Sequence, residues 1–71
     1  MALEIKSQVA GTVWKIEAGD GAKVAAGDTL IVIESMKMEI PVDAPREGTV
    51  VRFLVAEKDV VKDGQVLVIL D

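Results

Sequence analysis

The stretch LIVIESMKMEI, residues 30–40, decides the fold. It starts as a short aliphatic run, passes through polar residues and two methionines, and returns to an apolar residue. This pattern predicts a β-hairpin with a tight turn at Met36 and Lys37. A two-residue turn gives three opposing pairs, which are Ser35 with Met38, Glu34 with Glu39 and Ile33 with Ile40.

Two local preferences are broken at this turn. Two-residue hairpin turns need positive φ angles and favour Asn-Gly, Asp-Gly or a leading Gly, whereas Met36-Lys37 offers neither. Glu34 and Glu39 would also face each other as like charges, at a cost of about 0.2–1 kcal/mol. Because such conflicts concentrate at functional sites, Lys37 at the tip is a candidate functional residue.

An internal repeat organises the rest of the chain. At an offset of 37 residues (48 − 11), Gly11-Thr12-Val13 falls on Gly48-Thr49-Val50, and residues 30–34 fall on residues 67–71 without an insertion. A repeat used twice predicts two interlocked halves related by approximate two-fold symmetry about one core. The repeat leaves residues 35–39 unmatched, between the halves.

Both halves predict strands. Residues 29–33 and 66–70 are short apolar runs that follow turn glycines at Gly27 and Gly64, and no segment has helical periodicity. The expected fold is all-β, a flattened barrel or sandwich of two pseudo-two-fold-related halves that forms a single domain over residues 1–71. Asp71 corresponds to Glu34 in the repeat, so we expect it to lie far from Lys37.

Composition narrows the function. The 71 residues are 51% hydrophobic, carry a net charge of −4 and include no cysteine or histidine. Burial alone must therefore stabilise the core, and disulfides, ordinary zinc sites and Ser-His or Cys-His catalysis are excluded. Scattered basic residues argue against a nucleic-acid partner, and the lack of a signal-peptide core or spanning apolar run favours a cytoplasmic protein with no membrane partner.

Several motifs together resemble the biotinyl/lipoyl attachment domain family, most closely its biotin carboxyl carrier protein domains. Residues 34–38 are similar to the Glu-Ala-Met-Lys-Met signature of that family, with Ser35 at the alanine position. Residues 10–13, Gly27-Asp28 and residues 48–50 are similar to its Pro-Gly-x-Val, Gly-Asp and Gly-x-Val elements. The short first half has no room for the extra thumb segment of some members.

The resemblance implies that a biotin protein ligase joins biotin to the Lys37 amine. The biotin would carry a carboxyl group between the biotin carboxylase and carboxyltransferase components of a biotin-dependent carboxylase. The chain itself would be a non-catalytic carrier, monomeric as an isolated domain. The resemblance also makes Met36, Met38 and Glu34 cofactor-site residues beside Lys37.

Several alternatives remain open. Met38 could belong to the core, Glu39 could be simply solvated, and Trp14 is expected to be a packed or partly covered strand residue. Two other functions fit the same fold, a lipoyl carrier with lipoate on Lys37 that shuttles acyl groups and an unmodified interaction domain.

Overall fold

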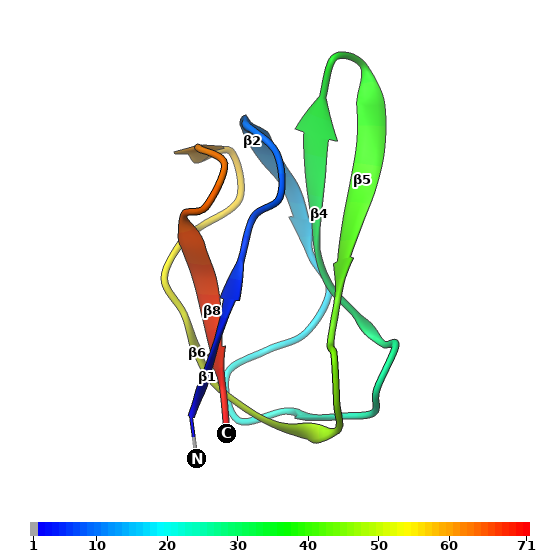
Figure 1. The fold of residues 1–71 in the computed structure, drawn as a ribbon, viewed down its shortest axis with the longest axis vertical. Helices are drawn as coiled ribbons and strands as arrows, with labels where there is room; N and C mark the ends of the chain where they lie inside the picture. The colour runs from blue at the N-terminus through cyan, green and yellow to red at the C-terminus, as the bar shows by residue number, and fades with distance from the viewer. Residues whose placement is uncertain (1) are drawn as a thin grey trace.

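A computed structural model describes residues 2–71 and shows two antiparallel sheets packed face to face (Figure 1). One sheet has the order β1 (Leu3–Lys6), β8 (Val66–Leu70), β6 (Gly48–Phe53) and β3 (Lys23–Val24). The other has the order β5 (Met38–Asp43), β4 (Thr29–Ser35), β2 (Gly11–Ile16) and β7 (Val60–Val61). The predicted all-β sandwich is confirmed.

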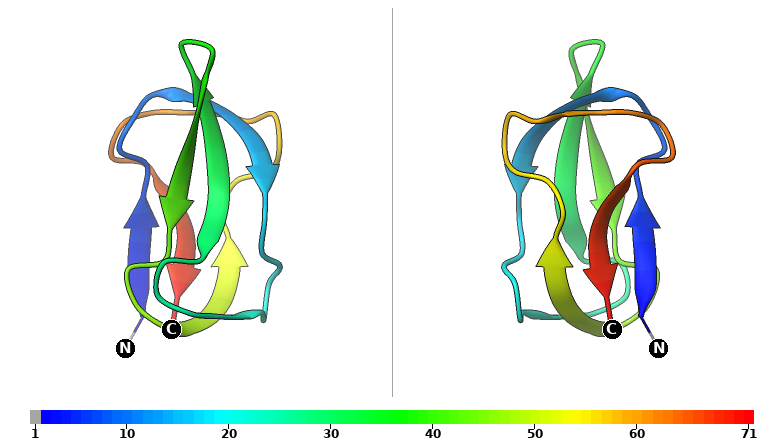
Figure 2. Two further views of the ribbon diagram at one scale, coloured as in Figure 1. Left: turned by 90° about the vertical axis from the view of Figure 1, so that its right-hand side faces the viewer. Right: turned by 90° about the vertical axis from the view of Figure 1, so that its left-hand side faces the viewer.

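The two halves of the sequence pair in the same way. In β1 and β8 Ile5 lies opposite Val68, and 37 residues away (42 − 5) Val42 of β5 lies opposite Ile31 of β4. The register shifts at equivalent points in both ladders. Each sheet therefore contains strands from both halves, as two interlocked units require (Figure 2).

The core between the sheets is aliphatic. Its buried hydrophobic residues are Ile5, Val13, Leu30, Ile31, Ile33, Ala44, Val50, Val61, Leu67, Val68 and Leu70. Leu30 and Ile31 are adjacent and yet both buried, because the β4–β5 ladder shifts between Thr29 and Ile31. Ile33 and Leu67, which the apolar runs place in the core, are fully buried.

The turns that the repeat duplicates in both halves have glycine at equivalent positions, with one exception at Lys58. Gly27 and Gly64 have φ angles of 88° and 85°, so their turns use the left-handed region that glycine enters without strain. Gly21 has φ 82°, whereas its counterpart in the second half is Lys58, at φ 78°. Lys58 therefore adopts the glycine conformation with a full side chain.

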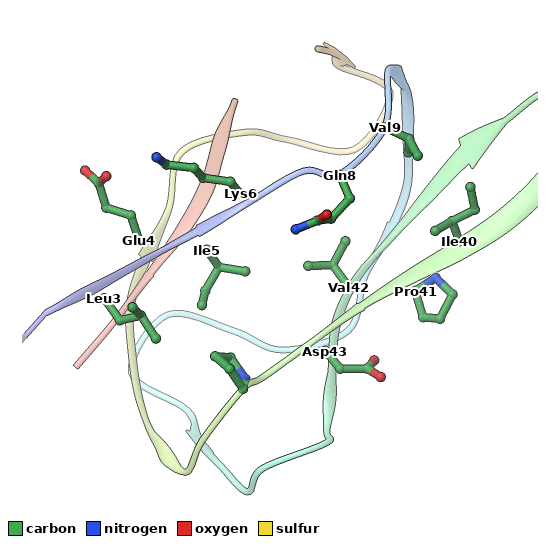
Figure 3. Close-up of a pocket in the computed structure, with 11 residues that line it drawn as sticks. Leu3, Glu4, Ile5, Lys6, Gln8, Val9, Ile40, Pro41, Val42 and Asp43 are labelled. Carbon is green, nitrogen blue, oxygen red and sulfur yellow. The ribbon is translucent and has the colours of Figure 1, made fainter. Parts of the chain in front are cut away.

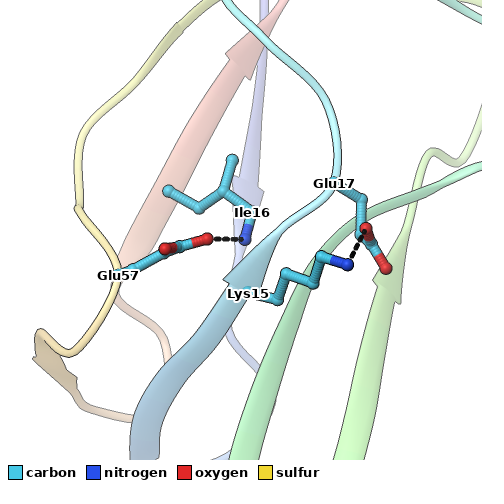
Figure 4. Close-up of polar contacts among 4 residues, drawn as sticks. All are labelled: Lys15, Ile16, Glu17 and Glu57. Carbon is cyan, nitrogen blue, oxygen red and sulfur yellow. Dashed lines mark hydrogen bonds and ion pairs between the residues drawn. The ribbon is translucent and has the colours of Figure 1, made fainter.

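Carboxylates from loops bind backbone amides of the other half. The Ile16 amide donates to Glu57 Oε2 at 3.1 Å (Figure 4). The equivalent Phe53 amide donates to Asp20 Oδ1 at 3.2 Å. These bonds close the ends of β2 and β6. The nearby Lys15–Glu17 ion pair, at 3.7 Å, is exposed and contributes little to stability.

The molecule is elongated, with extents of 32 × 17 × 17 Å. The β4–β5 hairpin projects at one end of the long axis, and the start of β1 and the end of β8 lie at the other (Figures 1 and 2). Asp71 is therefore remote from Lys37, as the repeat predicts.

Candidate functional site

The tip of the β4–β5 hairpin has the predicted register. Ser35 lies opposite Met38, Glu34 opposite Glu39 and Ile33 opposite Ile40. Only Met36 and Lys37 remain in the turn. The hairpin extends the sheet beyond the rest of the sandwich (Figure 2).

Both turn residues adopt the left-handed backbone conformation. Met36 has φ 51° and Lys37 has φ 66°, the sign that a type I′ turn requires at both positions. Neither residue is glycine, and this conformation costs an ordinary residue roughly 1–2 kcal/mol. Such strain persists only where the surrounding structure determines the backbone. The flanking strands therefore fix the Lys37 backbone while its side chain projects outward.

The stem of the hairpin is anchored to the strand beside it. The Ser35 hydroxyl donates a 2.8 Å hydrogen bond to the Ala10 carbonyl, just before β2. At Gly11 a Cβ atom would collide with the Glu34 carbonyl oxygen and lie 2.9 Å from Ile33 Cγ2. Glycine is therefore needed where β2 meets the stem, and Ser35 adds a side-chain link that alanine could not supply.

The side chains at the tip are open to solvent. Met36 is 93% exposed and Met38 is 64% exposed, which decides against a core position for Met38. Lys37 is exposed as well, and among residues 2–71 its ammonium group has neither a hydrogen-bond partner nor an ion-pair partner. An amine so placed is available for acylation by an approaching enzyme.

Glu34 and Glu39 are both exposed on the outer face of the hairpin stem. Thr12 lies opposite Glu34 in β4 and opposite Val60 in β7. The residues that face one another across this sheet therefore change from acidic at the hairpin to apolar at β7. Val60 is 77% exposed, and Trp14, at the β2 bulge, is 55% exposed. Trp14 lies in a strand as expected, but it is exposed and not packed into the core.

A groove that the sequence does not predict lies below the tip. It opens between β1 and β5, with Leu3–Lys6, Gln8 and Val9 on one side and Ile40–Asp43 and Pro45 on the other (Figure 3). Its volume is about 480 Å³. Only the repeat offset, which pairs residues 3–5 with residues 40–42, could have indicated that these two segments are equivalent edges.

Other kinds of site are not found in the described residues. No group of three or more potential metal-ligating side chains occurs within residues 2–71. The same range has no helix long and apolar enough to cross a membrane.

Comparison with known proteins agrees with the hairpin and the fold. Residues 4–70 match the family model of biotin/lipoyl domains described as "Biotin-requiring enzyme". A biotin/lipoyl attachment protein of Bacillus subtilis is 38% identical over 65 residues, covering 92% of this chain and 89% of that protein. A biotinylated protein of Mycobacterium leprae is 33% identical over 70 residues, covering 99% of each.

Among solved structures, the urea carboxylase of Kluyveromyces lactis superimposes with a TM-score of 0.95 at 35% identity. The match covers all of this chain and 6% of the carboxylase chain. Fold and tip together define the class of small carrier domains that present a lysine on a hairpin. The chain belongs to the biotin-requiring family, as a biotin carboxyl carrier domain, and this family of carriers is typically non-catalytic.

Proposed function

We propose that Lys37 carries biotin as an amide on its Nζ atom and that the domain shuttles a carboxyl group between two partner active sites. The observation that carries this proposal is the geometry of the tip. Lys37 is exposed, unpaired among the described residues, and held in the left-handed region between two exposed methionines. A strained turn made of non-glycine residues is typical of a site kept for function.

The attachment step uses the Lys37 amine as a nucleophile. Nζ, as the neutral amine left after the ammonium loses a proton, forms a bond to the carbonyl carbon of an activated biotin acyl group. The activating group leaves with the bonding electron pair, and the nitrogen releases a second proton to solvent. The product amide is uncharged, so the ammonium charge at the tip disappears. Bound biotin supplies a ureido nitrogen that accepts and releases the carboxyl group.

The other tip residues support this role. Met36 and Met38 present flexible, polarizable side chains that can pack against partners of different shape. Glu34 offers a carboxylate three residues before Lys37, which a biotin protein ligase would read with basic groups. Ser35 holds the stem through its bond to the Ala10 carbonyl.

The partners we propose are a biotin protein ligase, a biotin carboxylase and a carboxyltransferase. The likeness to urea carboxylase supports a carboxylase context. We propose that the isolated domain acts as a monomer. We expect it to be a non-catalytic carrier, since the sequence has no histidine or cysteine to serve as the usual catalytic groups.

Intact-mass measurement after co-expression with a biotin ligase tests the proposal. Wild type should gain one biotinyl group, and Lys37→Arg should gain none, because guanidinium keeps the charge but lacks an acylable amine. Lys58→Arg is the matched control, since Lys58 is also exposed and left-handed but lies outside the hairpin. Co-expression with a lipoyl ligase separates the alternatives, because modification by that ligase alone would indicate a lipoyl carrier. No modification by either would indicate an interaction domain.

A further inference from the structure

The groove below the tip lies between two unpaired sheet edges. β1 and β5 are the outermost strands of different sheets, and the groove runs along both of them. Its volume of about 480 Å³ falls within the range of small-molecule sites, roughly 300–1,000 Å³. The groove is thus large enough to receive a compact bicyclic group.

The lining combines apolar walls with one free amide. Ile5 and Val42 point into the space between the strands, and so does the Gln8 amide, whereas Glu4 and Lys6 point away from it (Figure 3). Within the described part of the chain, the Gln8 side chain has no hydrogen-bond partner. Gln8 can therefore both donate to and accept from a ligand.

An apolar track connects the tip to this groove. Met38, Ile40 and Val42 alternate along β5 and share one face, since side chains two residues apart in a strand point the same way. Ile40 and Val42 line the groove, and Met38 continues the track toward Lys37 in solvent. A flexible group attached at Lys37 would pass Met38 before it reached the groove.

The distances fit. Ile40 follows Lys37 by three residues, about 10 Å along an extended strand. The stem from the lysine Cα to the biotin ring contains eleven bonds, which reach about 14 Å when extended. The ring can therefore reach the end of the groove near Ile40 without a change in the backbone.

We propose that the biotinyl group on Lys37 rests in this groove when no partner holds it; this inference depends on the proposed attachment at Lys37. The bicycle would contact Val9, Ile40 and Val42, and its ureido group would hydrogen-bond the Gln8 amide. A short tether gives an effective concentration in the millimolar range, so a millimolar intrinsic affinity would keep about half of the molecules docked. Partner enzymes would then bind the molecules in which the biotinyl group is extended into solvent.

Nuclear magnetic resonance of the fully biotinylated domain tests this placement directly. We expect nuclear Overhauser effects between the biotin ring protons and the methyl groups of Ile40 and Val42. Apo and biotinylated spectra should differ at Gln8 and Val9 as well as at residues 36–38. Capture by avidin supplies a second measurement, because avidin binds only the extended form.

Gln8→Ala should speed avidin capture about twofold, the change expected when half the population is released. Glu4→Ala is the matched control, because Glu4 is at the same edge but points away from the groove, and it should capture at the wild-type rate. Complete mass gain with spectral changes confined to residues 36–38 would overturn the groove site and leave the carrier function standing. No mass gain at Lys37 would overturn both.

Discussion

Gly11 is a position where the packing of the backbone leaves no room for any side chain. A methyl group there would collide with the Glu34 carbonyl oxygen and approach Ile33 Cγ2 to 2.9 Å. Carbon atoms in ordinary contact are about 3.5–4.0 Å apart, so β4 would have to move by roughly 0.6 Å or more. Overpacking of this kind costs about 1–3 kcal/mol. We expect Gly11→Ala to lose stability by that amount and to distort the stem that carries Lys37.

Gly48 provides a control that few proteins offer. It is the repeat equivalent of Gly11, and a methyl group there would collide with the Asp71 carbonyl oxygen and lie 3.2 Å from Leu70 Cγ. Gly48→Ala should therefore lose a comparable amount of stability. Gly48 begins β6 at the end of the molecule opposite the hairpin (Figure 1). Its substitution should leave the tip unchanged.

Urea denaturation and single-turnover biotin transfer, followed by mass spectrometry, separate the two effects. Both variants should remain folded at 25 °C, since a domain of this size has roughly 4–11 kcal/mol of stability. Gly11→Ala should slow transfer to Lys37, and Gly48→Ala should not. Gly19→Ala, which would meet no atom within 4 Å, should match wild type in both assays. Equal slowing by Gly11→Ala and Gly48→Ala would refute the argument, because rate would then follow stability rather than the position of the stem.

Three further substitutions test other parts of the structure. Leu67→Ala should cost about 2–5 kcal/mol in a denaturant melt, because the side chain is fully buried, and a loss under about 1 kcal/mol would contradict the core described above. Lys58→Gly should raise the free energy of unfolding by up to about 1 kcal/mol, and with it the melting midpoint, because glycine adopts the left-handed conformation at φ 78° without strain. A lower midpoint would count against strain at this turn. Glu34→Gln should change stability by no more than about 1 kcal/mol while slowing biotin transfer at low salt, with the deficit shrinking as salt is added. Equal transfer rates at every salt concentration would leave Glu34 without a recognition role.

The hairpin could be predicted from the sequence because its signals are local and reinforce one another. Period-two alternation fixes which residues oppose each other. A two-residue turn of type I′ has positive φ angles at both Met36 and Lys37 whatever their side chains, and a type II′ turn has one at Met36 alone. The repeat then fixes the pairing of distant strands. The positive φ angle of Lys58 could also be predicted, because the repeat offset aligns Lys58 with Gly21. The residue type of Lys58 alone gives no indication of it.

The remaining features depend on tertiary geometry. Met38 is exposed because the hairpin extends past the facing sheet. The alternation of apolar and polar residues indicates which face of a strand a side chain occupies, but it does not indicate how far one sheet extends past the other. The bulge at Trp14 has no glycine to mark it. The groove forms only when β1 and β5, which are far apart in sequence, end up as neighbouring edges.

The symmetry of the fold also explains why the tip stands alone. In one half, Ile33 of β4 pairs with Ile40 of β5 and a turn joins them; in the other, Leu70 of β8 pairs with Leu3 of β1 at the ends of the chain. The hairpin turn is therefore the symmetry equivalent of the place where β1 starts and β8 ends, and the two places lie at opposite ends of a molecule 32 Å long. Because the second half has no turn at the equivalent place, the left-handed backbone of Met36 and Lys37 has no counterpart there. This backbone strain therefore cannot be ascribed to the fold that both halves share. The sandwich requires a connection between β4 and β5, but it does not require methionine and lysine there, and this difference supports the role proposed for the tip.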